Sequence, residues 1–267
     1  MSPNAKDIVM NTQFLKVMSV GESGEGKSIF ASSFPTPGFI FDFGDENISY
    51  KGKDFWFEQY PLELAGWSKY EKDFMTLKKC LDEDKRFPGD DGTGTYQTVV
   101  VDNVTAMTDL CMQKALQLDP KRSETGGPIW NVHYGMVKNL MEGKLRQLIN
   151  LNCNVVLIAH LEIITDKKTG EVIGVAPSMT GSLGVDIPSY FHEVYYHTHK
   201  RDGETTKWYV QTIPIGRNHG RSRASGEKRL LPDYVENNYN EIMDYLMGKK
   251  IKGVAGKPAV TATQTKK

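Results

Sequence analysis

The sequence predicts an α/β fold with a mostly parallel central sheet flanked by helices. The apolar run from Phe14 to Val20 leads into a glycine-rich loop and a helix-forming stretch from Lys27 to Phe34, which is a strand–loop–helix turn. Two later runs, 98–103 and 154–160, are apolar without alternation, as expected for strands covered on both faces. Both end on polar residues, where open α/β sheets bind ligands.

The glycine-rich loop fills the phosphate-binding pattern G-x-x-x-x-G-K-[ST] at every fixed position. Its glycines allow positive φ, so that consecutive backbone N–H groups surround an anion. We expect Lys27 to be exposed and to reach the β- and γ-phosphates of ATP, and the Ser28 hydroxyl to ligate Mg²⁺. The alternative is a glycine-rich turn that carries Lys-Ser by chance, and the flanking strand and helix argue against it. The predicted nucleotide-binding residues are Gly21, Glu22, Ser23, Gly24, Glu25, Gly26, Lys27, Ser28 and Ile29.

Composition indicates a globular protein of 267 residues, with 39% hydrophobic and 25% charged residues. Cys80, Cys111 and Cys153 lie far apart without CxxC spacing, which predicts buried thiols rather than disulfides or a zinc site. No apolar run has the length of a membrane span, and the N-terminus lacks a signal-peptide core, so we expect a cytoplasmic protein with no membrane partner.

Charge is balanced overall, with 33 basic and 33 acidic residues, but it is unevenly distributed. From Lys200 onward, 14 Lys and Arg stand against 7 Asp and Glu. The excess of basic residues in this C-terminal quarter of the chain is compatible with binding of a polyanion, or simply with a solvated terminus.

Other segments complete the predicted fold. Strands are expected at 38–43, 193–199 and 207–214, the last two antiparallel, and helices at 67–81, from 104, at 134–150 and at 237–247. Residues 82–96 and 216–229 are predicted as loops, and 164–187 as a β-hairpin followed by a mobile loop. We expect an N-terminal extension at 1–10, one nucleotide-binding domain at 11–247 and a disordered basic tail at 248–267.

Two polar residues close the buried strands. Asp102 lies near the end of the run Thr98–Asn103, directly after its apolar residues, and is the natural acid to contact Mg²⁺, directly or through water, as in a Walker B strand. The alternative role for Asp102 is as N-cap of the helix from Val104. His160 ends the next strand at the same rim, where it would hydrogen-bond the γ-phosphate or the attacking water; the alternative is an ordinary surface polar residue.

Taken together, the P-loop, the strand ending FDF, the VVVDN strand and the NVVLIAH strand resemble the RecA-like ATPases of bacteriophages. These include RecA/RadA-related proteins described as single-strand annealing or recombination ATPases. The resemblance covers roughly residues 11–246, and the stretch SMTGSLGVDIPSYFHEVYY and the basic loop narrow it toward this group. It implies a RecA-like P-loop core with antiparallel strands at the C-terminal end, and host-cell cytoplasm as the location if a phage encodes the chain.

The resemblance also implies cofactors, partners and site residues. ATP and Mg²⁺ are the cofactors, and the loop 161–184, with Lys167 and Lys168 as its basic residues, would contact single-stranded DNA. A homo-oligomeric ring or filament would place Arg217, Arg221 or Arg223 at the γ-phosphate of the neighbouring subunit; their alternative is a solvated or DNA-binding loop. A single-strand binding or replication protein is a further partner. Where RecA has its catalytic glutamate, two residues beyond Asp42, this chain has Gly44. Asp45 or Glu46 in a shifted register, or another acid, then takes that role; we select Glu46.

Three function classes therefore remain. The first is a Mg²⁺-dependent, oligomeric ATPase that acts on single-stranded DNA in phage recombination, replication or repair. The second is a nucleotide switch that loads or recruits another protein and has little DNA affinity. The third is a small-molecule kinase, which shares the P-loop but needs a mobile arginine-bearing lid and an acceptor pocket.

Overall fold

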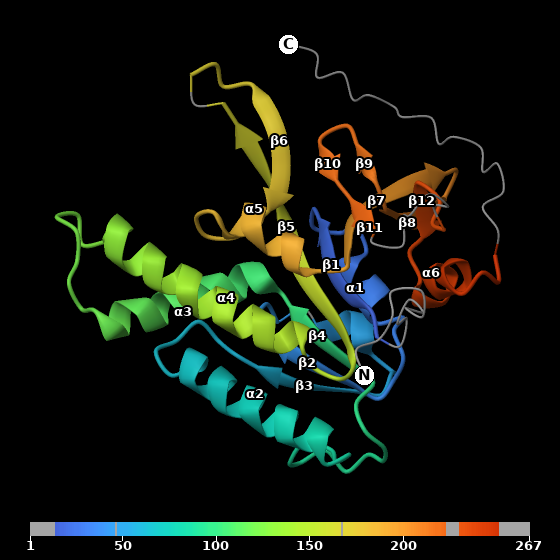
Figure 1. Ribbon diagram of the computed structural model, residues 1–267, viewed down its shortest axis with the longest axis horizontal. Helices are drawn as coiled ribbons and strands as arrows, with labels where there is room; N and C mark the ends of the chain where they lie inside the picture. The colour runs from blue at the N-terminus through green and yellow to red at the C-terminus, as the bar shows by residue number, and fades with distance from the viewer. Residues whose placement is uncertain (1–13, 46, 167, 223–229, 251–267) are drawn as a thin grey trace, which may run out of the picture.

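A ten-stranded sheet forms the centre of the molecule (Figure 1). The computed structural model describes residues 14–45, 47–166, 168–222 and 230–250. Eight strands follow the order β12-β8-β7-β1-β5-β4-β2-β3, while β6 pairs with β5 and β11 with β7. Neighbouring strands from β7 to β3 along this order pair in parallel, whereas β8 pairs antiparallel with both β7 and β12. They are β1 (Lys16–Gly21), β2 (Gly38–Asp42), β3 (Phe55–Gln59), β4 (Thr98–Asp102), β5 (Asn154–Thr165), β6 (Val172–Pro177), β7 (Glu193–Asp202), β8 (Thr205–Gln211), β11 (Arg221–Ser222) and β12 (Tyr234–Glu236).

Helices cover both faces of this sheet (Figure 1). One face packs against α2 (Gly66–Asp82), α3 (Val104–Leu118) and α4 (Gly135–Ile149) and forms the larger apolar core. The other face packs against α1 (Lys27–Ala31) and α6 (Tyr239–Leu246). Because β1, β2 and β4 are buried along their whole length, their sequences are continuous apolar runs. The short elements are η2 (Asn47–Tyr50), η3 (Trp130–Tyr134), α5 (Leu183–Asp186), η4 (Ile187–Tyr190) and the hairpin of β9 (Pro214–Ile215) and β10 (Asn218–His219).

The predicted fold class is confirmed: a mostly parallel sheet flanked by helices continues into antiparallel strands at its C-terminal end. The expected hairpin after residue 164 forms, because β5 and β6 pair around a turn at Asp166. All three cysteines are buried thiols, as predicted.

Four local predictions were wrong. The predicted loop 216–229 contains two short strands, β10 and β11, and β11 pairs with β7. The strand β3 was not expected, since its residues are only partly buried at the sheet edge and carry no alternating pattern. The Ser/Thr/Gly-rich run was predicted as loop as far as residue 187, but it enters α5 and η4, which bury Leu183 and Ile187 in the larger core. The helix after the P-loop ends at Ala31 instead of Phe34, and residues 32–34 form a turn.

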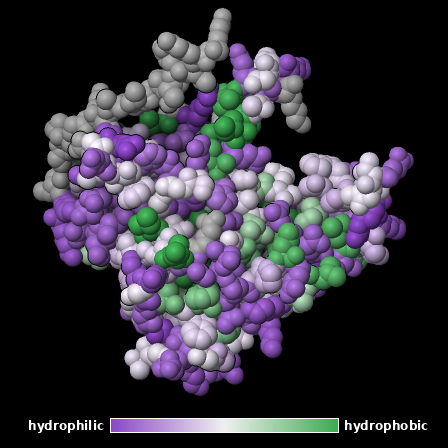
Figure 2. All heavy atoms as spheres, turned by 180° about the vertical axis from the view of Figure 1, so that it is seen from behind, coloured by the Kyte–Doolittle hydropathy of each residue, from purple (hydrophilic) through white to green (hydrophobic). Residues whose placement is uncertain are grey.

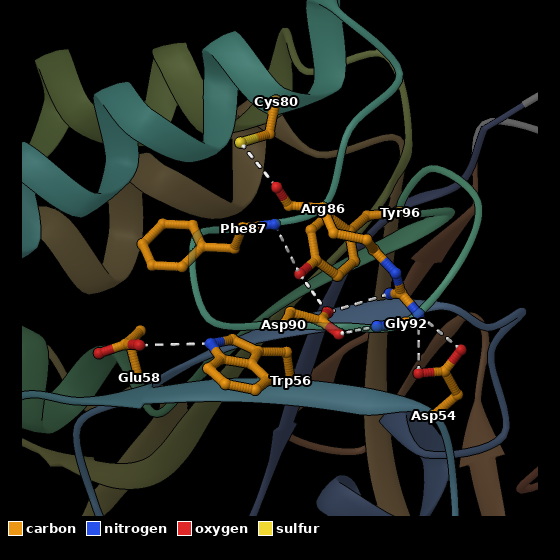
Figure 3. Close-up of polar contacts among 9 residues, drawn as sticks. All are labelled: Asp54, Trp56, Glu58, Cys80, Arg86, Phe87, Asp90, Gly92 and Tyr96. Atoms are coloured by element: carbon orange, nitrogen blue, oxygen red, sulfur yellow. Dashed lines mark hydrogen bonds and ion pairs between the residues drawn. The ribbon is translucent and has the colours of Figure 1, made fainter.

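Arg86 fixes the long loop between α2 and β4, as Figure 3 shows. Its Nη2 donates to both carboxylate oxygens of Asp54 at 2.9 and 2.8 Å, and its Nη1 lies 3.3 Å from Asp90 Oδ2. The guanidinium also lies 4.9 Å from the centre of the Tyr96 ring, whose hydroxyl donates to Asp90 at 2.6 Å. The loop is therefore tied to the β3 edge of the sheet.

We expect Arg86→Ala to lower the free energy of unfolding by about 3 kcal/mol, because the side chain is only 6% exposed and its loss leaves Asp90 buried without its cation. Urea denaturation measures this change. Lys85→Ala is the matched control, since its ion pair with Glu83 is exposed and screened by solvent, so its loss should leave the stability nearly unchanged. Equal stability of the two variants would contradict a structural role for Arg86.

The surface is mainly hydrophilic on the face seen in Figure 2, where apolar residues form small separate groups. None of the helices in the described part of the chain combines the length and the apolar composition that a membrane crossing requires.

Candidate functional site

The P-loop joins β1 to α1 and lies at the carboxyl end of the sheet. Gly24 and Gly26 both have φ of 82°, in the left-handed region that favours glycine. A side chain on Gly26 would also collide with Asn237 and Trp208, whose nearest atoms lie 2.9 Å from the position of its β-carbon. Glu22, Ser23 and Gly24 are exposed, and Ile29 is 43% exposed on α1. The loop therefore has the glycine-dependent shape that the motif predicts.

Lys27 bends back over this loop. Its Nζ donates to the backbone oxygen of Glu22 at 2.6 Å, and the residue is 5% exposed, so the expectation that it would be exposed was wrong. A phosphate group in the loop offers this ammonium group stronger, charged acceptors than the carbonyl oxygen. The side chain is thus held where a phosphate would be bound.

Residues of the C-terminal strands, and one residue after them, contact the P-loop. Trp208 Nε1 on β8 donates to the oxygen of Gly24 at 3.2 Å, and Asn237 Nδ2 donates to the oxygen of Gly26 at 2.8 Å. Glu25 Oε2 lies 3.0 Å from His199 Nδ1 on β7. Sequence reasoning missed these contacts, because they join residues more than 170 positions apart and have no local pattern.

His197 lies beneath the loop with its Nε2 2.6 Å from the Ser19 hydroxyl. Burial, and then the positive charge of Lys27, lowers the pKa of His197 to about 3. The imidazole is therefore neutral at neutral pH and contributes no charge under the phosphate-binding loop.

Asp102 meets the P-loop through a tyrosine. It ends β4 at 1% exposure, and its Oδ2 accepts a hydrogen bond from the Tyr50 hydroxyl at 3.0 Å. The Ser28 side chain lies near enough to the same hydroxyl to lower its pKa slightly. Burial, and then the charge of Asp102, raises the pKa of Tyr50 well above its usual value, which keeps this donor protonated. Ser28 supplies a hydroxyl and Asp102 a carboxylate oxygen, both near the Tyr50 hydroxyl. Such hard oxygen ligands fit Mg²⁺.

The helix cap after β4 is Asn103. Its Oδ1 accepts from the backbone N–H of Ala106 at 2.8 Å, so the alternative of Asp102 as N-cap is wrong. Its Nδ2 lies 3.2 Å from His160 Nε2. The Asp102 carboxylate is therefore not used to cap α3, because the Asn103 side chain accepts from the first turn of that helix.

His160 lies directly beside the start of the P-loop. It pairs in register with Gly21, because β1 and β5 are parallel neighbours. Its backbone oxygen accepts from Ser178 at 2.7 Å, and Thr105 Oγ1 donates to the oxygen of Ser178 at 2.9 Å. His160 is thus placed where the β5–β6 hairpin leaves the sheet, at the rim that was predicted for it.

The acidic loop after β2 is organised by Asp42. Its Oδ1 accepts from the backbone N–H groups of Gly44 and Asp45 at 3.2 and 2.8 Å, and Asp42 pairs in register with Asp102. Asp45 accepts from Gln59 Nε2 at 2.7 Å. Glu46, the predicted catalytic acid, lies outside the described residues.

The three arginine candidates differ in their surroundings. Arg217 lines a cavity of about 300 Å³ together with Glu22 and Glu25 of the P-loop. Arg221 donates from Nη2 to the backbone oxygens of Pro188 at 2.9 Å and Phe191 at 2.7 Å, within its own chain. Arg223 lies outside the described residues.

The candidate DNA loop is the β5–β6 hairpin, which extends beyond the sheet in Figure 1. Lys168 is exposed at its turn, where Asp166 Oδ1 accepts from the backbone N–H of Lys168 at 2.8 Å. Lys167 lies outside the described residues. Ile163 and Ile173 are 55% and 62% exposed on the hairpin.

A family model described as an AAA domain matches residues 13–224, most of the chain. The chain belongs to this AAA-domain family. Membership and the intact P-loop together make the AAA domain a P-loop NTPase. No curated protein matches it.

Two solved structures are similar to this AAA domain. A KaiC-like protein from the hyperthermophilic archaeon Pyrococcus horikoshii OT3 has 12% identity and a TM-score of 0.40, over 74% of this chain and 77% of that one. The flagellar accessory protein FlaH from Methanocaldococcus jannaschii has 10% identity and a TM-score of 0.38, over 83% of this chain and 84% of that one.

Proposed function

We propose that the chain is a Mg²⁺-dependent ATPase that forms homo-oligomers and acts on single-stranded DNA in phage recombination, replication or repair. The observation that carries the ATPase is the meeting of Ser28 and Asp102 around the Tyr50 hydroxyl, beside a P-loop of the expected shape. Mg²⁺ bound there would neutralise charge that develops on the β- and γ-phosphates.

Three other residues of the chain would bind phosphate, support the loop and couple the nucleotide to the hairpin. Lys27 exchanges its carbonyl acceptor for phosphate oxygens, and the neutral His197 supports β1 under the loop. His160 borders both the P-loop and the base of the hairpin, so a shift of its backbone on phosphate loss would reach the hairpin through Ser178, which donates to its backbone oxygen. This path supports the coupling of nucleotide state to whatever binds the hairpin.

The test is fluorescence anisotropy of a labelled oligonucleotide with a non-hydrolysable ATP analogue or ADP, at two salt concentrations. We expect tighter DNA binding with the analogue, and linkage then requires DNA to raise the affinity for the analogue by the same factor. If Lys167 and Lys168 make the phosphate contacts, the logarithm of affinity falls with that of salt with a slope of about −1.4.

The double variant Lys167→Ala and Lys168→Ala should bind DNA less tightly and bind ATP unchanged without DNA. Lys114→Ala, which removes a partly exposed lysine of α3, should leave both affinities unchanged. Tight ATP binding with no DNA binding in any nucleotide state would contradict the DNA proposal.

That outcome would favour the second candidate, a nucleotide switch that recruits another protein. The exposed Ile163 and Ile173 favour it, because an apolar hairpin surface suits a protein partner better than a phosphate backbone. A single-strand binding or replication protein is the partner we propose for such a switch.

A further inference from the structure

A row of three buried polar side chains lies beside the P-loop. The row consists of Ser19 on β1, His197 on β7 and Asn237 directly after β12, which come from distant parts of the sequence. The Ser19 hydroxyl lies 2.6 Å from His197 Nε2, and Asn237 Nδ2 donates to the oxygen of Gly26 at 2.8 Å. One end of the row is therefore the strand before the P-loop, and the other end is the last glycine of the loop.

The middle of this row contains two polar atoms without a hydrogen-bond partner in the described part of the chain. They are His197 Nδ1 and Asn237 Oδ1. Burial, and then Lys27, lowers the pKa of His197, and Asn237 has a smaller, opposite effect on it, so the two side chains are neighbours. Because an unpaired polar atom is costly in the interior, two such atoms on neighbouring side chains indicate one hydrogen bond between them.

The direction of this hydrogen bond follows from the contact with Gly26. A carbonyl oxygen only accepts, so the Asn237 group that faces Gly26 is its NH₂ group, and the atom left for His197 is the acceptor Oδ1. A neutral imidazole carries one donor and one acceptor. His197 Nδ1 is therefore the donor, and Nε2 accepts from the Ser19 hydroxyl.

The row ends on the peptide bond between Gly26 and Lys27. The Gly26 oxygen accepts from Asn237 and also from the backbone N–H of Phe30 at 2.9 Å. In a trans peptide the C=O and the N–H point in opposite directions, so these two donors turn the N–H of Lys27 away from themselves and toward the interior of the loop. That interior is where successive N–H groups of a P-loop surround an anion.

We propose that Ser19, His197 and Asn237 form one hydrogen-bonded relay that holds the Gly26–Lys27 peptide bond in the orientation that binds phosphate. The three are positioning residues, because they act through the peptide bond and not by touching the nucleotide. The inference rests on the proposed ATPase function. Since the backbone of a P-loop surrounds the α- and β-phosphates, the relay should strengthen the binding of ATP and of ADP alike.

The first test uses the full chain without nucleotide. NMR of isotopically labelled ring nitrogens distinguishes the two neutral tautomers of a histidine, and the signal of His197 is the one that is lost in His197→Phe. We expect the proton on Nδ1, because only this tautomer donates to Asn237 and accepts from Ser19. A proton on Nε2, or a charged ring at neutral pH, would overturn the relay.

The second test is a double-mutant cycle in nucleotide affinity, measured by calorimetry with a non-hydrolysable ATP analogue and with ADP. Asn237→Leu nearly keeps the side-chain volume, removes the donor to Gly26, and should weaken both nucleotides by about 10-fold. His197→Phe should weaken both by about threefold, and should have no further effect in the Asn237→Leu background. Asn240→Leu, which changes an exposed asparagine of α6, should bind both nucleotides like the parent.

Thermal denaturation without nucleotide separates positioning from a purely structural role. Lower thermal stability with unchanged affinity in both single variants would overturn the relay, and so would additive losses of affinity in the double variant. A loss for the ATP analogue alone would contradict it as well, because ADP carries the phosphates concerned. A parent protein that shows the expected tautomer but binds neither nucleotide would instead contradict the proposed ATPase function itself.

Discussion

Replacing Lys27 with alanine should weaken ATP binding by at least about 100-fold and leave the fold intact. The ammonium group would form charge-assisted hydrogen bonds to phosphate, each worth about 1.5–3 kcal/mol, and no other group in the loop replaces them. In the absence of nucleotide, its Nζ donates to the backbone oxygen of Glu22 at 2.6 Å. The fold therefore depends on Lys27 far less than the ligand does.

Isothermal calorimetry with ATP and Mg²⁺ measures the loss, and thermal denaturation without nucleotide measures the fold. Lys114→Ala is the matched control, because it removes a partly exposed lysine from α3, away from the P-loop. ATP affinity equal to that of the parent in the Lys27→Ala protein would contradict the phosphate-binding role of the loop.

Asp102→Asn has the second largest expected effect, on hydrolysis rather than on binding. The amide keeps the size of the carboxylate and still accepts from the Tyr50 hydroxyl, but it loses the charge that suits Mg²⁺. We expect phosphate release to fall by at least about 100-fold, and ATP affinity to fall by less than about 10-fold.

Tyr50→Phe separates the charge of Asp102 from its hydrogen bond. This variant removes the hydroxyl, keeps the buried ring against Phe55, and leaves the carboxylate in place. Its phosphate release should stay within about fivefold of the parent, because one neutral donor is lost. If Asp102→Asn released phosphate at the parent rate with saturating Mg²⁺, Asp102 would have only a structural role.

The sequence alone predicted the parts of the site that follow from local order. The P-loop is a contiguous motif. Asp102 was found because it ends a continuous apolar strand, and His160 because it follows the buried apolar part of β5, although that strand continues to Thr165. The register of β1 with β5 then places His160 beside Gly21, as the parallel arrangement required.

The parts that could not be predicted depend on distant segments. Tyr50, 52 residues before Asp102, reaches it because a 3₁₀ turn buries its ring, and such a turn has no reliable pattern. Asn237 lies 211 residues from Gly26 and is brought there by the pairing of β12 with β8. The edge strand β3 was missed because its half-exposed residues lack the apolar run that revealed its neighbours.

The contacts of Trp208 and Asn237 with the P-loop couple the folding of the nucleotide site to the folding of the C-terminal strands. Since the oxygens of Gly24 and Gly26 are held by β8 and the segment after β12, ordering the P-loop also requires these late segments to be folded. A ligand that binds only the ordered loop therefore stabilises the C-terminal strands by mass action. Amide hydrogen exchange in β8 should slow when ATP binds, and the indole of Trp208 gives a fluorescence signal for the same event.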